Sequence, residues 1–336
     1  MVKKETINSL SKDYINLIKI EFNKEEQQHS IIKKGDDMFI VKTANQTVYE
    51  ASLLPKPESL WDAFWFDGEL CCLFADSNIG KSILAVQIAE EIAQTKKVIY
   101  FDFELSDIQF YLRYKDKNDK LYKFQDNFYR AVINLESLLT DNIEESIIDA
   151  IANVVIEHQA NVIIIDNITF INSATEKGDI AGKVMIDLTM LKVKHNLSIL
   201  VLAHTPKRSL TKPITQNDLA GSKRLFNFFD SCFAIGKSAK DSCLRYIKQL
   251  KVRNGPFTYD EDNVIIYTIN KSGSFLGFEL VGYATEKEHL KELSDKDIFQ
   301  EIQTVKELAK KGMSYRKIAK KLEISKSKVE RILKKK

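Results

Sequence analysis

Short apolar runs alternate with amphipathic stretches through the middle of the chain. Each run holds four to six residues, which is typical of strands buried on both faces of a parallel sheet. The predicted strands are Leu70–Phe74, Val98–Phe103, Phe128–Ile133, Val162–Ile165 and Ile199–Ala203. Apolar positions at helical spacing lie between them and predict helices over residues 82–95, 106–115, 141–158 and 180–195. This alternation predicts an α/β fold with a mainly parallel sheet and helices on both of its faces.

The pattern changes at both ends of this α/β region. After about residue 230 the apolar segments are short, close together and linked by turns, which predicts an antiparallel extension of the sheet. Within the N-terminal segment, the spacing predicts a helix over Ile7–Phe22 and a hairpin that turns at Gly35. We divide the chain into an accessory segment at 1–57, a core at 58–284, a charged linker at 285–297 and a C-terminal domain at 298–336.

The composition is that of a water-soluble globular protein, with 44% hydrophobic and 29% charged residues among 336. No apolar stretch reaches the roughly 18–20 residues that cross a membrane, and the N-terminus has no signal-peptide core. The four cysteines include no CxxC pair, so they indicate buried thiols in a reducing compartment rather than a metal site. These features predict a cytoplasmic protein without a membrane partner.

The sequence ADSNIGKS follows the first predicted strand and precedes the first predicted helix. Strand, loop and helix in this order are the context of a phosphate-binding loop, whose backbone N–H groups and helix N-terminus face the phosphates. Lys81 is expected to reach the β- and γ-phosphates, and the Ser82 hydroxyl to bind Mg²⁺. Ala75 stands where the strict pattern has glycine, which an alanine with negative φ can replace. ATP and Mg²⁺ are the expected cofactors, and the nucleotide contacts are assigned to Ala75, Asp76, Ser77, Asn78, Ile79, Gly80, Lys81, Ser82 and Ile83.

Further polar residues stand at the C-terminal ends of predicted strands. Asp166 ends the run VIIID and is expected to hold the Mg²⁺ shell as a Walker B acid. Glu104 follows the second strand, where a carboxylate can orient or deprotonate the attacking water. Asp102 is the alternative, because both faces of that strand are buried. His204 ends the strand before TPK, where a histidine can sense the γ-phosphate or simply satisfy local hydrogen bonds.

The order of these elements resembles the RecA-type ATPase core. FDFELSDIQFYLRY and LKVRNGPF are similar to segments of replicative helicases of the DnaB type, and VLAHTPK is more like hexameric plasmid helicases of the RepA type. The chain also resembles AAA-family ATPases that accompany mobile elements of gut bacteria. The resemblance covers residues 65–283 and implies ATP hydrolysis in a homo-oligomeric ring, a hexamer in particular.

The residue types and their spacing in LKVRNGPF suggest a role for this segment. Lys251 and Arg253 alternate along a late strand, and Asn254–Pro256 then turns the chain. The resemblance implies that both cations reach the ATP of a neighbouring subunit, where such a finger contributes on the order of 10³–10⁵ in rate in other systems. The alternative is an exposed basic edge strand that prevents edge pairing.

Two loops are expected beside the γ-phosphate, at Ile171–Asp179 and Thr205–Asp218. The second carries Lys207, Arg208 and Lys212 and no acid before its last residue. In the RecA-type core such loops face the ring axis and contact single-stranded DNA, and cations suit contacts with its backbone. A solvated basic loop is the alternative.

The C-terminal end is strongly basic. Residues 306–336 hold 13 Lys/Arg and 3 Asp/Glu, whereas the rest of the chain is net acidic. Apolar positions predict three short helices, with Gly312 ending the first and Ser314 capping the second. This pattern is similar to the helix-turn-helix domains of resolvases and related regulators, and a lysine-rich helical interaction module is the alternative. The resemblance places duplex DNA contacts on Ser325, Lys326, Ser327, Lys328 and Arg331.

These features predict a DNA-acting ATPase. The most concrete expectation is a ring-forming helicase or translocase that serves replication or mobilisation of a plasmid or integrated element. A DNA-binding ATPase switch without unwinding activity, in recombination, transposition or regulation, is the alternative. A regulator with a degenerate ATPase scaffold is a third possibility, against which the intact set of Lys81, Ser82, Glu104 and Asp166 argues.

Overall fold

The computed structural model describes residues 39–134, 143–173, 180–205, 208–219, 223–292, 295–322 and 324–334. The chain divides into two compact units, residues 1–56 and 57–336. In the first unit, the Thr43 hydroxyl accepts the N–H of Gln46 and caps helix α2 (Ala44–Ser52). The helix predicted over Ile7–Phe22 and the hairpin at Gly35 lie outside the described residues.

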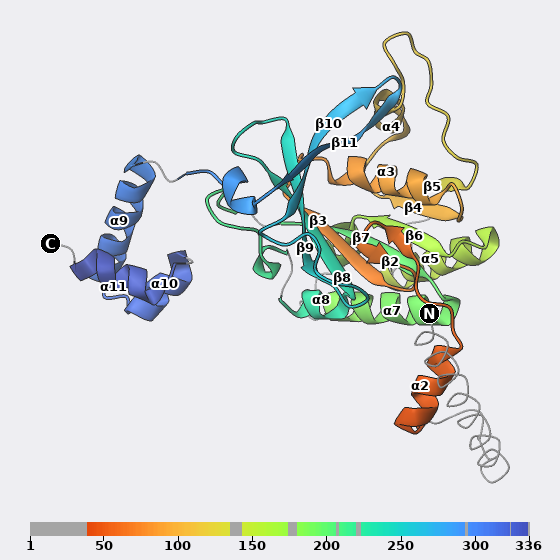
Figure 1. Ribbon diagram of the computed structural model, residues 1–336, viewed down its shortest axis with the longest axis horizontal. Helices are drawn as coiled ribbons and strands as arrows, with labels where there is room; N and C mark the ends of the chain where they lie inside the picture. Colours follow the sequence, from red (N-terminus) through yellow and green to blue (C-terminus); the bar gives the residue numbers. More distant parts are fainter. Residues whose placement is uncertain are drawn as a thin grey trace, which may run out of the picture. The chain divides into compact units, whose positions relative to one another are not determined.

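Among the described residues, a nine-stranded sheet forms the centre of the second unit (Figure 1). The six neighbouring strands from β8 to β5 are mutually parallel, and β9, β10 and β11 extend the sheet in antiparallel fashion. A separate hairpin joins β1 (Ser59–Trp61) to β2 (Trp65–Phe66). In spatial order the strands of the large sheet are β11 (Phe275–Ala284), β10 (Val264–Ser272), β9 (Leu244–Lys251), β8 (Ser231–Lys237), β3 (Leu70–Ala75), β7 (Ser198–His204), β6 (Val162–Asp166), β4 (Val98–Asp102) and β5 (Phe128–Val132).

Alternate residues of each central strand point to opposite faces of the sheet, and each face has its own apolar core. In β3, the odd-numbered residues from Cys71 to Ala75 pack with α3, and the even-numbered residues from Leu70 to Phe74 pack with α5 to α8. Figure 1 shows α3 and the layer of α5 and α7 on opposite sides of the sheet. The helices of this unit are α3 (Lys81–Ile92), α4 (Asp107–Arg113), α5 (Ile143–His158), α6 (Ile168–Ser173), α7 (Ile180–His195) and α8 (Lys223–Phe228).

The predicted fold class is confirmed, since an α/β core with a mainly parallel sheet and an antiparallel extension is followed by a small helical part. One strand differs from the prediction. The segment around Cys232, which the pattern groups with the antiparallel extension, forms β8 and runs parallel to β3. The pattern also misses α6 and α8, which are only six residues long.

Three helices form the C-terminal part, α9 (Asp295–Lys310), α10 (Tyr315–Leu322) and α11 (Lys326–Lys334). They enclose a small core of their own, and Gly312, with a φ of +74°, lies in the turn after α9. The buried residues of this core are Val305, Leu308, Ile318 and Val329. No helix in the described parts of the chain is both long and apolar enough to span a membrane.

The segment that precedes α9 is ordered against the α/β core. Residues 285–292, which we call the connector, leave β11 and form the short 3₁₀ helix η3 (Glu286–His289). Glu286 and His289 are buried, and the N–H of Lys291 donates to the Leu210 carbonyl at 2.9 Å. The first half of the stretch predicted as a linker is therefore fixed to the core, and its end already belongs to α9.

Candidate nucleotide site

The phosphate loop lies between β3 and α3, at the C-terminal edge of the parallel strands. Gly80 precedes the first helical residue with a φ of +105°, a conformation that glycine adopts without strain. A Cβ at this position would lie 2.5 Å from Ile269 Cδ1 and 3.0 Å from the Phe278 ring, because the β10–β11 hairpin covers the start of α3. Gly80 is therefore needed for the turn of the loop and for the packing of the hairpin.

The sheet order brings the candidate residues together. In the order β3, β7, β6 and β4, neighbouring parallel strands end at Ala75, His204, Asp166 and Asp102 along one edge. Since β7 lies between the strand of the phosphate loop and the strand of Asp166, residues far apart in the sequence face the same space.

Lys81 is almost fully buried at the N-terminus of α3. Its Nζ lies 3.1 Å from Nδ1 of His204. Burial lowers the pKa of Lys81, and the carboxylates of Asp166, Glu104 and Asp76 oppose that shift. The ammonium group therefore lies at the centre of an acidic cluster, next to the helix N-terminus that the sequence assigns to the phosphates.

Asp166 ends β6, and its side chain is fully buried. Oδ2 accepts a short hydrogen bond from the Tyr100 hydroxyl, whereas Oδ1 has no hydrogen-bond partner among the described residues. Burial raises the pKa of Asp166, and the Ser82 and Tyr100 hydroxyls oppose that shift. A buried carboxylate oxygen that lacks a donor, beside a serine hydroxyl, is a pair of hard oxygen ligands. Ser82 and Asp166 therefore fit a magnesium ion.

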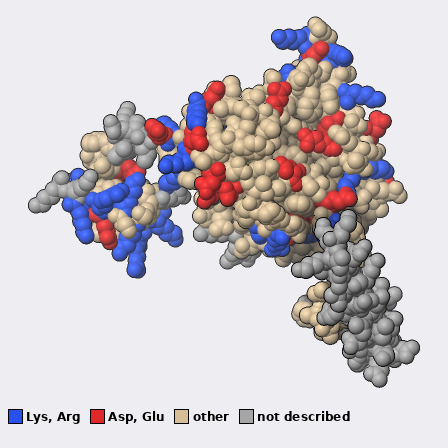
Figure 2. Space-filling model, in the orientation of Figure 1, with Lys and Arg blue, Asp and Glu red and all other residues tan. Residues whose placement is uncertain are grey.

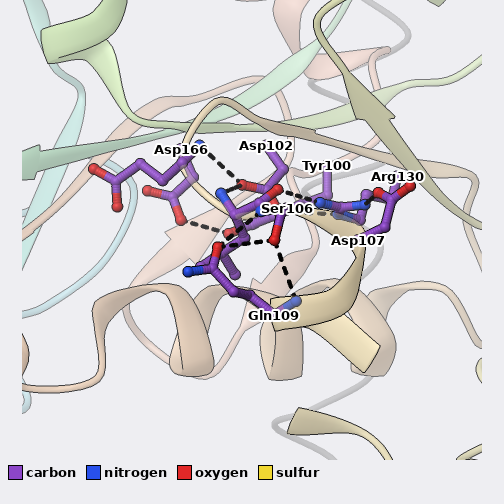
Figure 3. A network of polar contacts seen from close by, with 9 residues as sticks. Tyr100, Asp102, Ser106, Asp107, Gln109, Arg130 and Asp166 are labelled. Carbon is purple, nitrogen blue, oxygen red and sulfur yellow. Dashed lines mark hydrogen bonds and ion pairs between the residues drawn. The ribbon is translucent and has the colours of Figure 1, made fainter. Parts of the chain in front are cut away.

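The structure separates the two candidate bases, Glu104 and Asp102. Asp102 Oδ1 accepts the N–H groups of Glu104 (3.1 Å) and Leu105 (2.9 Å). Its Oδ2 pairs with Arg130 Nε at 2.9 Å, within a wider network that also contains Tyr100 and Asp166 (Figure 3). Both oxygens of Asp102 thus hold the turn after β4. The Glu104 side chain, in contrast, is 38% exposed and faces the site.

Asn167 joins Glu104 to His204, and the sequence pattern misses it. Its Nδ2 donates to Glu104 Oε1 and lies 2.9 Å from His204 Nε2, which is itself 3.2 Å from Glu104 Oε1. His204 Nδ1 faces the Lys81 ammonium, and its Nε2 lies within hydrogen-bond distance of both Asn167 and Glu104. A polar chain thus runs from Lys81 through His204 to Glu104. The only sequence signal for Asn167 is its place directly after Asp166.

Arg245 is a second residue that no motif marks. It lies at the start of β9, and its Nε donates to the carbonyl of Ile79 in the phosphate loop at 3.0 Å. Burial lowers the pKa of Arg245. The guanidinium therefore braces the phosphate loop from within the same subunit.

Lys251 and Arg253 lie near the N-terminal ends of the parallel strands, whereas the phosphate loop lies at their C-terminal ends. β9 runs antiparallel to β8, and Lys251 pairs with Cys232 near the start of β8. Lys251 Nζ donates to the Phe226 carbonyl at 3.1 Å, and the 56% exposed Arg253 pairs with Asp230 at 2.8 Å. Because β9 ends at Lys251, the two cations do not alternate along one strand as predicted. Neither of them reaches the phosphate loop of its own chain.

The loop after β7, which ends in the 3₁₀ helix η2 (Gln216–Asp218), differs from the predicted DNA-contacting loop. The Arg208 side chain is only 6% exposed and pairs with Asp76 of the phosphate loop at 3.8 Å. It is not a surface cation, because this acid and its other contacts draw the guanidinium inward. Lys212 is partly buried. Lys207 and residues 174–179 of the other predicted loop lie outside the described residues.

The predicted DNA-binding residues of the C-terminal helices have different surroundings. Ser325 accepts the N–H of Lys328 at 3.1 Å and caps α11. The Lys328 ammonium pairs with Glu301 of α9 at 2.7 Å, so its charge is neutralised within the C-terminal helices. The four that are exposed are Ser325, Lys326, Ser327 and Arg331. Figure 2 shows Lys and Arg side chains gathered over these helices.

Comparisons with known proteins concern the region of the candidate nucleotide site. Residues 43–209 match a protein family described as AAA domain, and this range contains the phosphate loop, Glu104, Asp166 and His204. This part of the chain is thus similar to an AAA domain, and the match includes the residues of the candidate nucleotide site. None of the curated proteins matches the sequence. Among solved structures, a KaiC-like protein from the hyperthermophilic archaeon Pyrococcus horikoshii OT3 is similar at 12% identity and a TM-score of 0.47, over 64% of this chain and 91% of that chain.

Proposed function

We propose that the chain is a Mg²⁺-dependent ATPase that binds duplex DNA through its C-terminal helices and couples ATP binding to that contact. The observation that carries the ATPase assignment is the meeting of Lys81, Asp166, Glu104 and His204 at one sheet edge within the AAA domain. A buried cation beside three acids and a helix N-terminus is suited to a phosphate chain and its metal ion.

The surroundings of each residue support its role in hydrolysis. A magnesium ion held by Ser82 and Asp166 would neutralise charge on the phosphates, and Lys81 would bind the β- and γ-phosphates. Glu104 has a partly exposed carboxylate at the end of the polar chain, so it is the group that can orient or deprotonate the attacking water. His204 lies within hydrogen-bond distance of that carboxylate and of Lys81, so a change at the γ-phosphate reaches Glu104 through one imidazole ring.

The charge distribution supports DNA binding at the C-terminal helices. Residues 306–336 carry a net charge of +10 in a chain of net +3, so the rest of the protein is acidic and repels a polyanion. The helices pack as a compact three-helix unit, which resembles a helix-turn-helix domain. The exposed cations on α10 and α11 are Arg316, Lys317, Lys320, Lys321, Lys326, Arg331 and Lys334.

Replacing Lys326, Arg331 and Lys334 together by alanine is expected to weaken duplex binding and to flatten its salt dependence. The fall of log K with log salt becomes shallower by about 0.9 for each phosphate that is no longer neutralised. Fluorescence anisotropy with one labelled duplex at several salt concentrations measures both effects. ATP hydrolysis without DNA should stay at the parental level, because none of the three residues belongs to the nucleotide site.

The matched control removes the same charge elsewhere. Lys117, Lys120 and Lys123 are exposed in the loop after α4, and their joint replacement by alanine should leave duplex affinity close to that of the parent. If both triple variants lose affinity equally, DNA is attracted only by net charge, and the assignment of α10 and α11 is wrong.

A switch that binds duplex DNA is better supported than a helicase by one observation. The axial-loop mechanism needs free cations in the loop after β7, but Arg208 is paired with Asp76 and buried. A ring-forming helicase or translocase is the second candidate, and the position of Arg253 favours it. This cation is exposed and lies far from the phosphate loop of its own chain, which suits a finger that acts on a neighbour's ATP.

Arg253→Ala tests the ring. We expect turnover to fall by on the order of 10³ while each subunit still binds ATP, because a finger acts only on the developing γ-phosphate charge. Folding should be retained, since Asp230 keeps its ion pair with Lys192 at 2.7 Å. Mixing with Lys81→Ala subunits should restore part of the activity, as those subunits bring an intact finger to the neighbour's site. Full activity in a strictly monomeric preparation would rule out action between subunits.

A further inference from the structure

The Asp76 side chain of the phosphate loop is held from the loop after β7. The Thr205 hydroxyl donates to Asp76 Oδ1, and Arg208 Nε lies 3.8 Å from Oδ2. The N–H of Thr205 also donates to the Ala75 carbonyl at 3.1 Å. The first residues of the phosphate loop are thus tied to Thr205 and Arg208 by side-chain and backbone contacts.

Arg208 carries this connection on to β9. Its Nη1 donates to the Lys212 carbonyl at 3.1 Å, and its Nη2 donates to the Tyr246 hydroxyl at 3.4 Å. Tyr246 is fully buried, and its hydroxyl donates to Glu286 Oε1 at 3.2 Å. A Cβ on Gly236 would lie 2.1 Å from the Tyr246 ring, so this glycine makes the space in which the ring lies.

Glu286 is the connector residue at which this polar chain ends. Its Oε1 also accepts the N–H of Ile214 at 2.7 Å, and its Oε2 pairs with Lys248 at 2.6 Å. Both oxygens have donors although the side chain is fully buried, which holds the carboxylate in one orientation. The connector is therefore linked to the phosphate loop through Tyr246 and Arg208.

We infer that Arg208 is a positioning residue for ATP binding and that the connector, through Glu286 and Tyr246, keeps it in place. The planar guanidinium offers donors in fixed directions, so one side chain can bind Asp76 and Tyr246 at the same time. Since the connector precedes α9 in the sequence, a force on the C-terminal helices is transmitted to the phosphate loop through these contacts. That last step rests on the proposed binding of DNA by those helices, whereas the role of Arg208 at the ATP site does not.

Tyr246→Phe interrupts these contacts by removing a single oxygen atom and leaves the ring in place. Without DNA, we expect the KM for ATP and the Kd of a fluorescent ATP analogue to rise about threefold to tenfold, as for the removal of one or two hydrogen bonds. We expect kcat at saturating ATP to change by less than about twofold, because Glu104 and Lys81 keep their places. Tyr283→Phe is the matched control, at a tyrosine that is 57% exposed on β11, and it should bind ATP as the parent does.

A double-mutant cycle separates positioning from general loosening of the fold. Asp76→Asn keeps an acceptor for Thr205 but removes the charge that faces Arg208, so Tyr246→Phe should have little further effect on KM in that background. If Tyr246→Phe does not fold, Arg208→Lys, which keeps the charge but loses the fork, should give the same split between KM and kcat.

A parental KM in the folded variant, or effects of the two substitutions that multiply in full, would overturn the inference. All of these measurements are made without DNA. They would keep their meaning if the C-terminal helices did not bind DNA, so the two proposals can fail separately.

Discussion

Lys81→Ala is expected to lower kcat for ATP hydrolysis by on the order of 10²–10³ or more, the effect of removing one preorganised charge at the transition state. ATP affinity should fall as well. Without the ammonium group, the phosphates would meet the carboxylates of Asp166, Glu104 and Asp76 with no cation between them except the metal ion. Steady-state hydrolysis and binding of a fluorescent ATP analogue measure the two effects.

Lys97→Ala is the control for this substitution. Lys97 precedes β4 at the opposite edge of the sheet, where its Nζ donates to the His158 carbonyl at 3.1 Å. It is also a lysine with a folded environment, but it lies away from the phosphate loop, so hydrolysis should continue at the parental rate. If Lys81→Ala hydrolysed ATP as fast as this control, the ATPase centre would have to lie elsewhere in the protein.

Glu104→Gln is expected to retain ATP binding and to lower kcat by on the order of 10²–10⁴, the usual contribution of a general base. The amide keeps the size of the side chain and can still contact Asn167 and His204, so the site should stay folded. An amide cannot take a proton from the attacking water. Single-turnover hydrolysis after ATP binding separates this chemical defect from a binding defect.

Asp102→Asn should have the opposite result. The carboxylate of Asp102 is buried against Arg130, so its loss should destabilise the fold by about 3 kcal/mol, as for a broken buried ion pair. Folded molecules should still hydrolyse ATP, because Asp102 does not face the site. Thermal denaturation and the rate per folded molecule test this contrast, and a catalytic defect confined to Asp102→Asn would exchange the two roles.

The central strands could be predicted to within one residue because their burial on both faces leaves continuous apolar runs. The direction of β8 could not be predicted, since a buried strand has the same composition whether its neighbour is parallel or antiparallel. Short helices such as α6 have too few turns for a hydrophobic period to be read.

In the candidate site, too, some residues could be predicted from the local sequence, whereas the roles of others depend on contacts with distant residues. Lys81 and Ser82 follow from a local motif, and Asp166 follows from its place at a strand end. The choice between Glu104 and Asp102 depends on Arg130, which β5 supplies from a distant part of the sequence. Likewise, the exposure of Arg208 is decided by Asp76 and Tyr246, and no spacing in the sequence connects these three residues.

The position of β3 has a consequence for synthesis on the ribosome. β3 is the first strand of the large sheet to be made, but its two neighbours, β7 and β8, come from much later in the chain. While β4, β5 and β6 can already pair with one another, the apolar segment LCCLFA has no partner strand in the nascent chain. An unpaired apolar strand is prone to aggregate, and the gap between β3 and β6 closes only when β7 has emerged. The nascent protein therefore needs protection of this strand from aggregation. It cannot form its phosphate-binding edge until about the first two thirds of its residues have been made.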